Sequence, residues 1–225
     1  MTRTKLCDRI LPDYTKGEEI FNTLSHIAGA AFGVAALLMC LAVSIGHQDI
    51  WAIISSTIYG AALILLYAIS SIYHGLPCGM AKKVMQVIDH CTIYILIGGS
   101  YTPVMLCAVR PISPAWAWTI LSLVWGCAII AIILTAIDLK KYAKFSMACY
   151  IGMGWCVVLA LKPTMEAVPI SGLLWLLAGG ISYTLGAVLY GLGKKHRYMH
   201  SCFHLFVVAG SVMQFITIFR YVLLW

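Results

Sequence analysis

Two histidines four residues apart open the last apolar stretch of the chain, in the pentapeptide HSCFH that begins at His200. Positions i and i+4 of an α-helix share one face, so His200 and His204 should point in the same direction. Ser70 and His74, in SSIYH, have the same spacing, and Asp89 is an acidic residue inside another apolar stretch. Ionisable groups are costly in such stretches and commonly mark functional sites. These five residues are therefore the first candidates for chemistry.

Imidazoles and a carboxylate near one point form the usual donor set of a zinc site with one position open to water. Ser70 would support that water or orient Asp89, or it would simply bond to the backbone of its own helix. The two histidines of HSCFH taken alone are equally compatible with hydrogen-bonded packing. Cys202 is not a candidate ligand, because two positions along a helix turn it away from the face that the two histidines share.

The composition is that of an integral membrane protein. Hydrophobic residues make up 62% of the 225 residues and charged residues 10%, and the mean hydropathy is +0.93, far from globular averages. A helix needs about 20 apolar residues to cross a bilayer. We predict an all-α, seven-transmembrane helix bundle that forms a single domain over residues 1–225. This domain includes a short N-terminal arm at 1–19. The predicted segments are 24–46, 50–74, 84–109, 115–137, 145–161, 170–192 and 198–224.

Positive charge is distributed unevenly between the two sides of this bundle. Twelve of the 15 lysines and arginines fall on the side of the N-terminus, and the others are Arg110, Lys162 and Arg220. The positive-inside rule then predicts a cytoplasmic N-terminus and an external C-terminus. The net charge of +7 follows from this topology and does not indicate nucleic-acid binding. The first twenty residues lack the apolar core of a cleavable signal, so we expect a multi-pass protein of the cytoplasmic membrane.

The same topology places His74, Asp89, His200 and His204 near the cytoplasmic ends of their helices, although these helices run in opposite senses. That common depth favours a shared site. His90 points about 100° away from Asp89 around its helix and is interpreted as a packing residue.

Glu19, Asn22 and His26 recur at spacings of three and four, so they line one face at the start of the first segment. Three roles are open to them: they could cap that helix, close a cavity from below or relay protons. We favour capping and interhelical hydrogen bonds. The cysteines include no C-x-x-C pair, and those in apolar segments are interpreted as buried apolar side chains.

Four motifs in order, EIFNTLSH (19–26), SSIYH (70–74), DHCTIYILIGGSYTP (89–103) and HSCFH (200–204), closely resemble the haemolysin III family. That family is the bacterial branch of the progestin and adipoQ receptors, which include the adiponectin receptors. The resemblance implies a seven-helix bundle with a cytoplasmic N-terminus. It also implies a Zn²⁺ ion held by His74, His200 and His204, with Asp89 and Ser70 contacting the metal-bound water. The wider superfamily contains lipid amidases, notably the alkaline ceramidases.

Our leading hypothesis is an intramembrane zinc hydrolase that acts on a lipid amide or ester and serves membrane lipid homeostasis, with Asp89 as the general base. The alternative is a non-enzymatic, zinc-containing regulator of the membrane state or a receptor-like protein. A pore-forming haemolysin ranks last, because no polar stripe continues through a predicted helix. Membrane lipids are the expected substrate or ligand. With so little chain outside the segments, we expect no large extracellular protein ligand.

Overall fold

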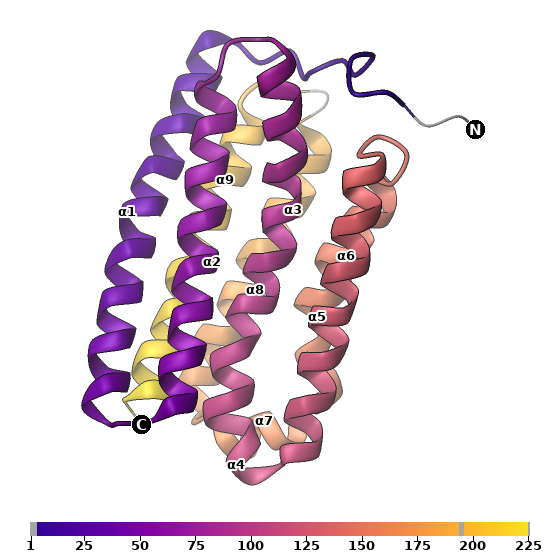
Figure 1. Cartoon of the computed structure of the whole chain (residues 1–225). Helices are drawn as coiled ribbons and strands as arrows, with labels where there is room; N and C mark the ends of the chain where they lie inside the picture. The colour runs from indigo at the N-terminus through magenta and orange to yellow at the C-terminus, as the bar shows by residue number, and fades with distance from the viewer. Residues whose placement is uncertain (1–3, 194–195, 225) are drawn as a thin grey trace.

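The computed structural model describes residues 4–193 and 196–224. These residues form helices and connecting loops, with no strand among them, and the helices run side by side as a bundle (Figure 1). Lys194 and Lys195, which we counted in the basic loop before HSCFH, lie outside the described residues, as does Arg3. The elements are α1 (Lys16–Gly46), α2 (Ile50–Gly75), α3 (Met80–Pro103), η1 (Val104–Val109), α4 (Arg110–Ile112), α5 (Pro114–Ile137), α6 (Ala143–Gly154), η2 (Cys156–Ala160), α7 (Leu161–Ala167), α8 (Ile170–Leu192), α9 (Met199–Ile218) and η3 (Phe219–Leu223).

Within the described residues, seven helical spans are long and apolar enough to cross a membrane. The third span joins α3, η1 and α4, the fifth joins α6, η2 and α7, and the seventh joins α9 and η3. The predicted all-α, seven-transmembrane helix bundle is thus confirmed, and the protein is a multi-pass integral protein of the cell membrane. The N-terminal arm and the end of η3 lie at opposite ends of the bundle (Figure 1).

The first helix begins at Lys16, eight residues before the start we predicted at residue 24. A capping box explains the difference. The Thr15 side chain accepts a hydrogen bond from the backbone N–H of Glu18, and the Glu18 carboxylate accepts one from the N–H of Thr15. These bonds satisfy donors that a helix start leaves free. Glu18 and Glu19 therefore lie in the first turn of α1, and Asp89 is not alone as an acidic residue within a spanning helix.

Glycines allow α1 and α2 to pack closely along their length. A Cβ atom added to Gly33 would lie 3.2 Å from the backbone nitrogen of Ile64, and one added to Gly60 would lie 2.5 Å from Cβ of Leu37. Small residues at such contacts let membrane helices approach each other closely, and the resulting van der Waals contacts stabilise the pair. The close packing of α1 on α2 fixes the polar face of α1 against the end of α2.

The third and fifth spans are longer than predicted and irregular. We predicted 84–109 and 145–161, whereas the spans are Met80–Ile112 and Ala143–Ala167. In the third, Pro103 ends α3 and a π-helical stretch follows, because proline cannot supply the N–H of a regular turn. In the fifth, the Tyr101 hydroxyl donates to the carbonyl of Gly154 and accepts from the N–H of Val157, both at 2.9 Å. A side chain inserted into the backbone ladder is a recognised cause of helix breaks.

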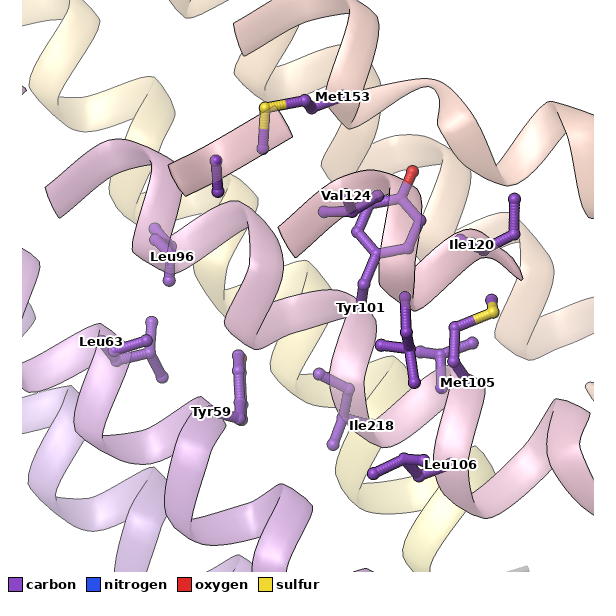
Figure 2. Close-up of a cluster of buried hydrophobic side chains, with 14 of the residues drawn as sticks. Tyr59, Leu63, Leu96, Tyr101, Met105, Leu106, Ile120, Val124, Met153 and Ile218 are labelled. Carbon is purple, nitrogen blue, oxygen red and sulfur yellow. The ribbon is translucent and has the colours of Figure 1, made fainter. Parts of the chain in front are cut away.

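Buried apolar side chains from several helices form the centre of the bundle. Figure 2 shows part of this cluster, in which Tyr59 and Leu63 of α2 lie near Leu96 of α3, and Ile218 comes from α9. Large buried side chains such as these hold the helices in a fixed arrangement. The other labelled members are Tyr101, Met105, Leu106, Ile120, Val124 and Met153.

The loops that we predicted on one side meet the N-terminal arm at one end of the bundle. The backbone N–H of Thr4 donates to the Asp138 carboxylate in the α5–α6 loop at 2.7 Å, and Lys83 at the start of α3 donates to the carbonyl of Cys7. The N–H of Tyr198, before α9, donates to Glu18 in α1 at 2.6 Å. The candidate site lies at this end.

Candidate metal centre

Three imidazoles from two helices converge at this end of the bundle. His74 is in the last turn of α2, His200 and His204 are in the first turns of α9, and all three are buried. The Nε2 atom of His200 lies 3.3 Å from Nε2 of His74 and 3.1 Å from Nε2 of His204. One donor atom from each residue lies within 4.8 Å of the others, so the group could hold a metal ion. The structure thus brings together the three histidines that we predicted as ligands.

The start of α9 is fixed by α1. Tyr198, the residue before α9, has a left-handed backbone with φ 60°, and its N–H donates to Oε1 of Glu18 at 2.6 Å. The other oxygen of Glu18 closes the capping box of α1. His200 follows Tyr198 by two residues. The contact of Tyr198 with the first turn of α1 therefore sets the position of the α9 histidines along the bundle.

Glu19 determines which nitrogen of His74 faces the other two histidines. Its Oε2 atom lies 2.6 Å from Nδ1 of His74, and its Oε1 atom accepts a hydrogen bond from Lys82 at 2.7 Å. An ionised carboxylate only accepts hydrogen bonds, so Nδ1 of His74 carries the proton. In the neutral form of the ring, Nε2 of His74 is then the unprotonated nitrogen, and it lies 3.3 Å from Nε2 of His200.

The polar face of α1 that we predicted does contact the histidines. The Asn22 amide lies 3.4 Å from Nδ1 of His74. The ring of His26 stacks on that of His204, with centroids 3.7 Å apart and planes at 21°. Neither ring nitrogen of His26 has a hydrogen-bond partner among the described residues. Glu19 and Asn22 make the interhelical contacts that we favoured. The capping role that we also favoured for this face is wrong, because Thr15 and Glu18 form the cap of α1.

Asp89 and Ser70 lie beside the histidines on the wall of a cavity of about 400 Å³. The Ser70 hydroxyl, from α2, lies near the Asp89 carboxylate of α3. His200 and His204 line the same cavity. A carboxylate, a hydroxyl and two of the three imidazoles therefore face one space.

His90 also lines this cavity, although we predicted a packing residue. Its Nδ1 atom lies 2.8 Å from the carbonyl oxygen of Gln86, and its Nε2 atom lies 3.1 Å from the hydroxyl of Tyr190. Asp89 is 3.9 Å away. With both nitrogens engaged by protein groups, His90 acts as a wall residue and makes the packing contacts expected of it.

The cavity extends from the histidines into the middle of the bundle along mostly apolar walls. Its lining includes side chains that are exposed on the outside of the bundle, where lipid surrounds a membrane protein. These side chains belong to the fifth and sixth spans, and they are Val158, Leu161, Met165, Ile170, Leu174 and Leu177.

A second cavity, of about 460 Å³, lies under the N-terminal arm and also reaches His200. The ring of Tyr14 stacks on His200, with centroids 4.8 Å apart and planes at 19°. Burial raises the pKa of the Tyr14 phenol, so this residue is a neutral cover over the imidazoles. We did not predict Tyr14 from the sequence, because nothing in the residues around it indicates a contact with α9.

Three imidazole nitrogens are a donor set that suits zinc, among other metal ions. Zinc binds imidazole nitrogen at about 2.0–2.1 Å, which separates two tetrahedral nitrogen ligands by about 3.3 Å. The two Nε2 separations that involve His200, 3.1 and 3.3 Å, agree with this spacing, and all three donor atoms lie within 4.8 Å of one another.

The fold and the site thus define a class of protein. It is a multi-pass membrane protein with a buried cluster of three histidines at one end of its helix bundle. Residues 14–215 match the Haemolysin-III related family. The chain is 37% identical to Hemolysin-3 of Bacillus cereus over 207 residues, which cover 92% of each protein. The chain belongs to the haemolysin III family.

Two further relatives extend the comparison. The chain is 32% identical to the Hemolysin-3 homolog of Bacillus subtilis (strain 168) over 208 residues, which cover 92% of this chain and 96% of the relative. It is 26% identical to the Monocyte to macrophage differentiation factor of Homo sapiens over 182 residues, 77% of this chain and 73% of the relative. The chain is therefore similar to proteins of both bacteria and animals.

Proposed function

We propose that this protein is an intramembrane zinc-dependent hydrolase that acts on a lipid amide or ester and takes part in membrane lipid homeostasis. The proposal rests on one observation, that a single cavity combines polar groups with apolar walls. Polar, reactive groups, Asp89, Ser70, His200 and His204, lie at one end of a cavity whose remaining walls are mostly apolar. Such a space suits a substrate with a polar bond and a long apolar chain.

His74, His200 and His204 would hold the ion. When bound, zinc acts as a Lewis acid toward a carbonyl oxygen and promotes the ionisation of water near neutral pH. Three protein ligands leave one tetrahedral position for water or substrate, as in other catalytic zinc sites. A fourth protein ligand would instead indicate a structural ion.

Asp89 would supply the acid–base chemistry. Its carboxylate faces the cavity beside the imidazoles, where it can accept a proton from the attacking water and later return it to the leaving group. Ser70 approaches this carboxylate from α2 and would keep one of its oxygens in a fixed direction. In this assignment Asp89 and Ser70 are the catalytic residues, and neither is a metal ligand.

The apolar part of the cavity would hold the acyl chain. The walls combine flexible and aromatic side chains, including Met105, Met147 and Tyr183. Because lining residues such as Leu161 and Leu174 are also exposed on the lipid-facing surface, a lipid would enter sideways from the bilayer. No soluble substrate is needed for this route.

Asp89→Asn tests the proposal. Asparagine keeps the shape of aspartate but is not a base, so zinc content should remain while hydrolysis of amide and ester lipids falls by about 100-fold or more. Zinc and turnover should be measured on the same preparation. Unchanged turnover at full zinc would remove Asp89 from the mechanism. If zinc-loaded wild type hydrolyses neither amide nor ester lipids, the hydrolase proposal is contradicted. That result would favour the regulator or receptor-like alternative.

A further inference from the structure

The carboxylate of Glu19 joins three helices at the back of the histidine cluster. Glu19 is in the first turn of α1, and it contacts His74 of α2 at 2.6 Å and Lys82 of α3 at 2.7 Å. The side chains of His74 and Lys82 are 0% and 4% exposed, and that of Glu19 is 20% exposed. Both partners of Glu19 are thus almost fully shielded from water, unlike those of a surface ion pair.

Lys82 also satisfies the end of α2. Its ammonium group donates to the carbonyl oxygens of His74 at 3.2 Å and of Leu76 at 2.8 Å. Carbonyls at a helix C-terminus lack partners within the helix and carry partial negative charge. One lysine therefore fixes both the backbone of His74 and the carboxylate that contacts its ring.

Helix capping does not account for Glu19. The neighbouring Glu18 makes the capping box with Thr15 and also binds the N–H of Tyr198. Both oxygens of Glu19 are instead committed to His74 and Lys82. The two adjacent glutamates have different tasks.

We propose that Glu19, held by Lys82, is a positioning residue of the metal site. Its carboxylate keeps the proton on Nδ1 of His74, orients the ring and makes Nε2 a better donor toward the centre of the cluster. Carboxylates that accept a hydrogen bond from a metal-binding histidine act in this way, and their loss typically weakens metal binding by about 10- to 100-fold. The inference rests on the metal site of the proposed function and is independent of lipid hydrolysis.

The test is the affinity of the full-length purified protein for Zn²⁺, measured by competition with a chelator, together with the visible spectrum of the Co²⁺-loaded protein. Glu19→Ala removes the acceptor and should weaken Zn²⁺ binding by about 10- to 100-fold. Glu19→Gln keeps a neutral acceptor and should fall between wild type and Glu19→Ala. Lys82→Met should also weaken binding, because it releases the carboxylate. The Co²⁺ spectrum should shift in each variant, since the field of the His74 ligand changes.

Asp49→Ala is the matched control. Asp49 caps the opposite end of α2, where its carboxylate accepts the N–H groups of Trp51 and Ala52. This change should lower thermal stability and leave both Zn²⁺ affinity and the Co²⁺ spectrum unchanged. If Glu19→Ala does not insert, the comparison of wild type with Glu19→Gln decides.

The outcomes separate the two proposals. Zn²⁺ bound equally by wild type and the Glu19 variants would overturn the positioning role and leave the metal site intact. No Zn²⁺ bound by wild type would overturn both. Weakened binding in the Glu19 variants of a protein that hydrolyses no lipid would support the positioning role and contradict only the hydrolase.

Discussion

His74 and His200 belong to helices at opposite ends of the sequence, yet their Nε2 atoms face each other at 3.3 Å. The contact joins the last turn of α2 to the first turn of α9. Its geometry depends on α1, which contacts His74 through Glu19 and fixes the residue before α9 through Glu18. The pair is therefore a direct measure of whether the ends of these three helices are assembled.

Replacing His200 by Ala should remove one of three metal ligands. We expect lower Zn²⁺ content in protein that still inserts. Chelation should lower the melting temperature of wild type, because an ion bound only by the folded state stabilises it by mass action. The variant should show little response to chelation. A fully occupied site in His200→Ala would exclude this residue as a ligand.

Gly180→Phe should obstruct the acyl cavity without touching the metal centre. Gly180 lines the cavity, and a Cβ atom added there meets nothing within 4 Å. Turnover of long-chain lipids should fall by about tenfold or more, equivalent to about 1.4 kcal/mol, while zinc content stays constant. Gly126→Phe, at a glycine with equally open space outside the cavity lining, is the control. Equal turnover in both variants would show that the chain binds elsewhere.

Gly60→Ala should destabilise the bundle. The new Cβ atom would lie 2.5 Å from Cβ and 2.9 Å from Cα of Leu37, so the two helices must separate. Overpacking of this kind costs about 1–3 kcal/mol. Gly126→Ala has free space and gains up to about 1 kcal/mol in helix propensity. Thermal or denaturant unfolding of both variants in detergent would distinguish them, and equal stability would mean that the α1–α2 contact tolerates a methyl group.

Asp138 should make stability fall in acid. Burial alone would raise the pKa of its carboxyl, but backbone N–H donors from Thr4, Lys141 and Lys140 outweigh burial and lower it. A lowered pKa means that the folded state holds fewer protons than the unfolded state. The stabilisation is therefore complete above the ordinary pKa of about 4 and disappears as the pH falls through the lowered value.

Asp138→Asn removes that titration. The melting temperature of wild type should decrease more between pH 5 and the acid limit, about pH 2–3, than that of the variant. Parallel curves would assign the acid sensitivity to other carboxylates. The measurement requires only the purified full chain in detergent.

Membrane orientation is the fifth prediction. The lysines and arginines concentrate at the end that carries the N-terminal arm, so this end should be cytoplasmic. Reporters fused to the two termini should give opposite signals, cytoplasmic at the N-terminus and external at the C-terminus. Signals from one side only would mean that one of the seven spans does not cross the bilayer.

The spans were predictable because the length of an apolar stretch is enough to identify a spanning helix. The sixth, for example, was predicted at 170–192 and is Ile170–Leu192. The start of α1 was missed because a capping box extends the helix through charged residues. The break near Trp155 was missed because its cause, the hydroxyl of Tyr101, comes from another helix.

The site shows the same division between local pattern and tertiary contact. The spacing within HSCFH indicated that its two histidines share a face, and the structure places both in the cluster. The contact of Glu19 with Lys82 joins residues 63 positions apart, and the cover over His200 comes from Tyr14. Neither has a periodic signature, since no helix face contains both partners.

His74 and His200 are separated by 126 positions, and the second and third histidines of the cluster belong to the last span. A ribosome must therefore finish almost the entire chain before the cluster can exist. A protein truncated before the final span would keep six membrane helices but one imidazole of the three. On the proposed metal site, added metal should stabilise the protein that contains all seven spans and leave such fragments unprotected, because a ligand stabilises only the state that binds it.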